Sequence, residues 1–149
     1  MTALPRILVP RTQLTDVDGI AVALLTVELW DDGIVLRLAG LPNEATQRML
    51  DEHEHDMTAW AERRQQSPND TSEAPPEEPG PLILNRINIG ITDEHGTSYR
   101  MMTRRTGGTG TELRDELYFQ PGMPKGTNHL TIHTSGSGLP ENAIQVPAT

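Results

Sequence analysis

Stretches in which apolar and polar residues alternate recur along the chain, and they predict β-strands. The range 20–30 is apolar on both faces at first and then alternates, which is typical of a central strand. In the next stretch, 33–40, the residues Ile34, Leu36 and Leu38 share one face. The predicted strands cover residues 6–9, 20–30, 33–40, 82–91, 97–103, 113–120 and 128–134, with a short possible edge at 143–146.

Turn residues separate these strands. Asp31-Asp32-Gly33 predicts a hairpin turn in which Gly33 supplies a positive φ, and Asp93 to Gly96 predicts a second hairpin turn. About seven short alternating strands with turns between them favour a mainly β fold, an antiparallel two-sheet immunoglobulin-like sandwich. The Cys-Trp-Cys pattern of true immunoglobulin domains is absent, because the chain has no cysteine.

One segment has the three- and four-residue spacing of an amphipathic helix. Asn43 can cap it, and residues 44–66 contain neither Gly nor Pro. Its apolar stripe comprises Ala45, Met49, Leu50, His53, Met57, Trp60, Ala61 and Arg64. Two interpretations stay open: the stripe completes the core of its own domain, or it binds another protein or a second copy. In the second case the contact residues are Met49, Met57 and Trp60.

Residues 67–81 have a different composition, with five prolines, four acidic residues and no large apolar residue. Such a segment buries too little surface to offset the entropy of ordering it, so we predict a disordered or extended acidic linker. The whole chain, residues 1–149, is expected to be a single domain. The helical excursion 43–66 and the linker 67–81 are inserted between its predicted strands.

Charge and composition limit the classes of partner and site. The chain has 21 acidic and 12 basic residues and a formal net charge of −9, which disfavours nucleic acids and anionic membrane surfaces. The lack of cysteine excludes disulfides, thiolate nucleophiles and cysteine-rich zinc sites. Residues 1–10 have no signal-peptide core, and no stretch is apolar enough to insert into a membrane. A cytoplasmic location is therefore expected.

Histidines are the main candidates for a metal or catalytic site. His53 and His55 are two positions apart, so they face different sides of the predicted helix. His129 and His133 share a strand face but lie about 13–14 Å apart along it, too far to share an ion. We therefore expect surface histidines, with no catalytic, cofactor-binding or metal-binding residue. The alternative is a hydrolase or metal-dependent enzyme whose site assembles from His95, His129, His133 and nearby acids.

Two further features lie near the predicted strand 113–120. The Gly-rich segment 106–111 lacks the Gly-Lys-Ser/Thr ending of a phosphate-binding loop, so we predict a mobile hairpin loop. Arg104-Arg105 is the most basic spot in the chain and is expected to meet an acidic partner or the acidic linker. Asp115 falls on the apolar face of its strand, which places it near the strand's start or on a bulge.

Several segments of the second half resemble a bacterial layout. They are the run from Ile91 to Tyr99, the Gly-rich loop, the run Leu117-Tyr-Phe-Gln-Pro121 and the run Asn128-His-Leu-Thr-Ile132. Over about residues 82–134 they are similar to immunoglobulin-like β-sandwich domains of uncharacterised bacterial proteins, some attached to anti-sigma or cell-envelope proteins. The resemblance implies the fold and no catalytic residue, and the helix lies outside it.

These observations favour a non-enzymatic protein-binding or accessory module that uses the helix stripe or a sheet edge. No cofactor is expected. Besides the enzyme alternative, a purely structural domain of a larger envelope protein remains a third hypothesis.

Overall fold

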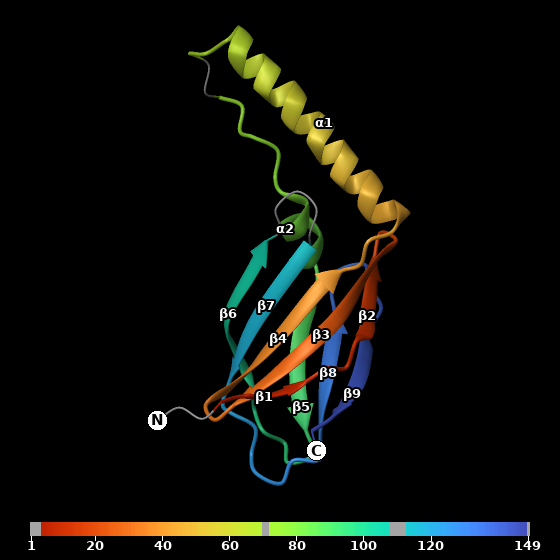
Figure 1. Ribbon diagram of the computed structural model, residues 1–149, viewed down its shortest axis with the longest axis vertical. Helices are drawn as coiled ribbons and strands as arrows, with labels where there is room; N and C mark the ends of the chain where they lie inside the picture. The colour runs from red at the N-terminus through yellow and green to blue at the C-terminus, as the bar shows by residue number, and fades with distance from the viewer. Residues whose placement is uncertain (1–3, 70–71, 108–112, 149) are drawn as a thin grey trace.

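The computed structural model describes residues 4–69, 72–107 and 113–148, in which the chain forms two antiparallel sheets and two helices (Figure 1). The fold is mainly β. The strands are β1 (Arg6–Leu8), β2 (Thr12–Val17), β3 (Ile20–Trp30), β4 (Gly33–Gly40), β5 (Asn88–Asp93), β6 (Arg100–Gly107), β7 (Leu113–Gln120), β8 (His129–Ser135) and β9 (Asn142–Pro147). The helices are α1 (Glu44–Gln66) and α2 (Pro79–Leu84).

The larger sheet has six strands in the order β1-β3-β4-β7-β6, and β2 also pairs with β3. Both short strands fit on one edge because β2 pairs with the start of β3 and β1 with its end. The smaller sheet has the order β5-β8-β9. All ladders are antiparallel.

A single hydrophobic core is shared by the two sheets. Ile34, Leu36 and Leu38 alternate along β4 with at most 1% of their surface exposed. Leu130 and Ile132 of the smaller sheet are fully buried in the same cluster. Since each such side chain contributes roughly 1.5–3 kcal/mol when fully buried, this alternation largely determines which face of each strand points inward.

The prediction of about seven strands is wrong, because the described residues contain nine. The missed strand β2 lacks clean alternation: its register shifts between Gln13 and Thr15, so Leu14 and Thr15 are both buried. Its signal was the turn Asp18-Gly19, where both residues have positive φ and lead directly into β3. The possible edge at 143–146 is β9, which is the outer strand of the smaller sheet.

Two predicted turns have a different physical basis from the one expected. Gly33 does not adopt a positive φ. It is needed instead because a Cβ there would clash with the Tyr118 ring and lie 2.7 Å from the carbonyl oxygen of Phe119. Gly96 does have a positive φ of 73°, but the turn at Asp93 is not a hairpin. β5 pairs with β8 and β6 with β7, so this turn carries the chain from one sheet to the other.

The predicted strand 82–91 is wrong in its first part, since α2 occupies its start and β5 begins only at Asn88. The expectation of a single helix is also wrong, because α2 is a second helix. The prolines of α2 lie in its first turns, where a missing N–H costs little. Ile83 and Leu84 are buried, and α2 contacts β6 and β7, so tertiary packing stabilises this short helix.

α1 extends away from the sheets, and residues 72–78 lead back without helix or strand to α2 (Figure 1). The helix begins where expected, because the side chain of Asn43 accepts a hydrogen bond of 2.8 Å from the Thr46 amide. It ends at Gln66, the last residue of the predicted range. Neither helix in the described residues has the length and apolarity needed to span a bilayer.

Candidate functional site

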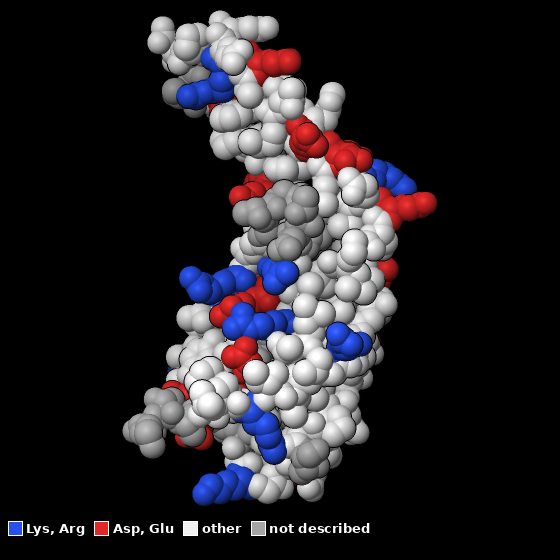
Figure 2. Space-filling view, in the orientation of Figure 1, with Lys and Arg blue, Asp and Glu red and all other residues white. Residues whose placement is uncertain are grey.

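Charged side chains alternate across the outer face of the larger sheet, where Figure 2 shows blue and red groups side by side. Arg37 of β4 donates to Glu28 of β3 at 2.7 Å and to Glu116 of β7 at 2.6 Å. The hydrogen bond with Glu28 is the main reason why the pKa of Arg37 is raised. Because 45% of the Arg37 side chain is exposed, these pairs contribute at most about 1 kcal/mol each to stability.

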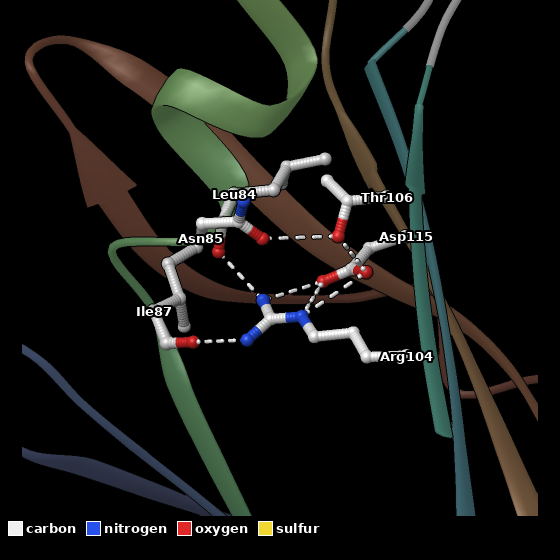
Figure 3. Close-up of polar contacts among 6 residues, drawn as sticks. All are labelled: Leu84, Asn85, Ile87, Arg104, Thr106 and Asp115. Atoms are coloured by element: carbon white, nitrogen blue, oxygen red, sulfur yellow. Dashed lines mark hydrogen bonds and ion pairs between the residues drawn. The ribbon is translucent and has the colours of Figure 1, made fainter.

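Arg104 and Arg105 are neighbours in sequence, but their side chains lie on opposite faces of the larger sheet. Arg105 is exposed in register with Glu116, on the outer face of the sheet. Arg104 points inward and forms an ion pair of 2.6 Å with Asp115, whose side chain is fully buried (Figure 3). Asp115 is the third residue of β7, near the start of the strand as expected. The expectation that Arg104 meets an outside partner or the acidic linker is therefore wrong, because its partner is in the neighbouring strand.

The Arg104 guanidinium also binds two backbone carbonyl groups. It donates to Leu84 O at 2.6 Å, at the end of α2, and to Ile87 O at 2.8 Å, just before β5. Thr106 donates to the other oxygen of Asp115 at 3.0 Å. This polar cluster joins the larger sheet to α2 and to Ile87, the residue just before the first strand of the smaller sheet. The carboxylate of Asp115 accepts hydrogen bonds from Arg104 and Thr106 and is buried away from solvent. We therefore assign the cluster a structural role, which is to position α2.

His129 and His133 lie on β8 and have different polar neighbours. His133 lies 2.7 Å from the Thr92 hydroxyl, whereas His129 lies 4.0 Å from the Glu94 carboxylate. His53 is half-buried on α1 and His55 is exposed, so the two face different sides of the helix. Among the described residues no group of three or more His, Asp or Glu side chains is placed to hold a metal ion.

Asp93 organises the turn between the sheets. Burial alone would favour its neutral form, but hydrogen bonds from Thr97, Tyr99 and the His95 amide outweigh it and lower the pKa of Asp93 to about 2. Burial and the 2.7 Å hydrogen bond to Asp93 raise the pKa of Tyr99. At neutral pH the pair is a carboxylate bound to a neutral phenol, an arrangement that holds the turn in shape.

Most members of the predicted stripe of α1 are half-buried, but Ala61 is exposed, and the buried residue of the helix, Thr46, lies outside the stripe. The members of the stripe also have different neighbours. Ala45 and Met49 pack against the hydrophobic core. Met57 and Trp60 are half-buried and lie outside that core. The structure therefore separates Met49, which completes the domain, from Met57 and Trp60, which lie farther along the projecting helix.

The returning chain covers one side of the stripe near the end of α1. Trp60 Nε1 donates to the carbonyl of Glu73 at 3.1 Å, and the carboxylate of Glu73 forms a bidentate ion pair with Arg63. Arg64 lies over the Trp60 ring, 5.6 Å from its centroid. Glu73 was not singled out from the sequence, because a contact between a linker residue and a helix leaves no periodic signal.

A hollow of about 430 Å³ lies along the first half of α1. Its described lining residues include Pro42, Thr46, Leu50, His53 and Met57. The hollow combines apolar side chains with an imidazole, and the carboxylates of Asp51 and Glu54 also line it.

The Gly-rich segment 106–111 lies outside the described residues from 108 onward, and Thr106 and Gly107 belong to β6.

We predict that Asp115→Ala destabilises the protein by about 3–5 kcal/mol, because it leaves the Arg104 guanidinium buried without its counter-ion. The matched control is Glu116→Ala at the next position of β7, which removes only an exposed partner of Arg37 and costs about 1 kcal/mol or less. Chemical denaturation of both variants measures the difference. Equal losses would show that the Arg104 cluster does not hold the fold together.

The lowered pKa of Asp93 predicts that the free energy of unfolding decreases in acid. Its pKa is lower in the folded state than the ordinary 3.8, so its contribution is complete above 3.8 and is lost as the pH falls through about 2. Asp93→Asn lacks this proton linkage, so its free energy of unfolding should fall less than that of the wild type over the same pH range. Thermal unfolding at a series of pH values tests this, and parallel curves would contradict it.

Comparison with protein-family models, with curated proteins and with solved structures found no match.

Proposed function

We propose that this protein is a non-enzymatic binding or accessory module that contacts another protein through the outer part of α1. The observation that carries the proposal is the division of the stripe: Met49 packs on the core, whereas Met57 and Trp60 lie beyond it. A helix obtains most of its stability from tertiary packing of its apolar face. Among the described residues of the stripe, only Ala45 and Met49 pack against the hydrophobic core. A partner would complete the rest.

The chemistry of the surface suits a helix-in-groove contact. Methionine adapts to irregular surfaces, and tryptophan is a common anchor in interfaces. The hollow beside Leu50, His53 and Met57 offers a place for a partner side chain. The scaffold that presents this helix is, in our proposal, an immunoglobulin-like sandwich built from the two sheets.

The capture of partners from a lysate of the source organism tests the proposal when two variants are compared. Met57→Glu places a charge in the stripe, and Thr58→Glu places the same charge at an exposed position one residue further on. Loss of a central anchor weakens binding by about 2 kcal/mol or more, roughly 30-fold. We expect a partner that wild type and Thr58→Glu retain and Met57→Glu loses.

Circular dichroism and thermal unfolding must show that both variants stay folded. A partner retained equally by both variants would place its contact elsewhere on the molecule. If Met57→Glu unfolds the protein and Thr58→Glu does not, the stripe is part of the core and the proposal fails.

A further inference from the structure

β6 is an outer strand of the larger sheet. Within the described residues its only ladder is with β7, and Figure 1 shows it along the left margin with no strand beyond it. The strand has eight residues and no proline, and α2 lies against its last residue, Gly107. No described strand pairs with its open side, where an unpaired edge can accept an extended segment. Met101 and Met102 are large apolar side chains that are 44% and 42% exposed on this strand.

The register of β6 against β7 fixes where its two exposed arginines point. Arg100 is opposite Gln120 and Arg105 is opposite Glu116, and these partners are four positions apart on β7. Leu117 and Phe119 are buried, so Gln120 and Glu116 are on the outer face of the sheet. Arg100 and Arg105 therefore share this outer face, although they are five positions apart. The register shift between Met101 and Thr103 absorbs the extra residue.

Neither Arg100 nor Arg105 forms an ion pair with any described residue. Asp31 and Asp32 line the same hollow as Arg100 without pairing with it. The edge therefore carries two unpaired guanidinium groups in a chain whose net charge is −9. Two β6 strands pairing antiparallel would bring Arg100 of one copy near Arg105 of the other, and like charges across a ladder are destabilising. This edge disfavours self-pairing and favours an acidic strand.

We propose that β6 binds an extended acidic peptide segment of another protein as an additional strand. On that segment two carboxylate side chains four positions apart face Arg100 and Arg105, following the spacing of Gln120 and Glu116 on β7. An apolar residue next to the first carboxylate faces Met101, whose register partner is the buried Phe119. This surface is separate from the stripe of α1, so the two proposals succeed or fail independently.

A labelled synthetic peptide of about ten β-forming residues tests the inference by fluorescence anisotropy. The probe has Glu at positions i and i+4 with valine between them. One control replaces both Glu by Gln, and another moves the second Glu to i+3. Each cross-strand charge pair adds up to about 1 kcal/mol. We therefore expect the i, i+4 peptide to bind up to about 30-fold more tightly than the Gln control, which loses both pairs, and up to about fivefold more tightly than the i+3 control, which loses one.

Charge reversal supplies the second arm of the test. Arg100→Glu with Arg105→Glu should lose the Glu peptide and bind its Lys counterpart instead. The matched control, Arg6→Glu with Arg48→Glu, changes the net charge equally at two other exposed sites and should bind as the wild type does.

Three results would overturn the inference: no binding of the i, i+4 peptide to wild type, equal binding of the i+3 peptide, or equal loss in both double variants. Amide chemical shifts that respond to the peptide outside β6 and its neighbour β7 would also do so.

Discussion

The ion pair between Arg104 and Asp115 holds together parts of the chain that are distant in sequence. Removing two charges from water is costly, and the cost is offset here because Arg104 also binds the carbonyls of Leu84 and Ile87. Leu84 ends α2, where a cation also interacts favourably with the helix dipole. The cluster thus fixes the point at which the excursion after β4 rejoins the sheets.

With that point fixed, α1 is held near both of its ends. Asn43 caps its start directly after β4, and Glu73 of the returning chain binds Arg63 and Trp60 near its end. Between these attachments the helix extends away from the core (Figure 1). Local interactions, including the hydrogen bond from Gln47 to Asp51, support a helix that receives little packing from the body. The result is a helix that is ordered and still presents part of its apolar stripe.

Local patterns in the sequence were sufficient for the elements that depend on them. The absence of Gly and Pro after Asn43 gave α1 its correct limits, and alternation gave β3, β4 and β7. β2 was missed because a register shift breaks its alternation, and α2 because its stability comes from packing on β6 and β7. The partner of Arg104 could have been suspected, since Asp115 is an acid at an inward position of a neighbouring strand. Its bonds to Leu84 and Ile87 depend on how the sheets pack, which no local pattern records.

The two sheets and the Arg104 cluster stabilise the fold, and we propose that the outer part of α1 is available to a partner. Native-state hydrogen exchange, followed amide by amide, tests this most directly. We predict that amides from Met57 to Arg64 exchange through local opening at a lower free energy than the amides of Leu36, Asp115 and Leu117, which should exchange only on global unfolding. If the α1 amides exchanged with the same free energy as those of the central strands, the helix would belong to the core. That result would contradict the account.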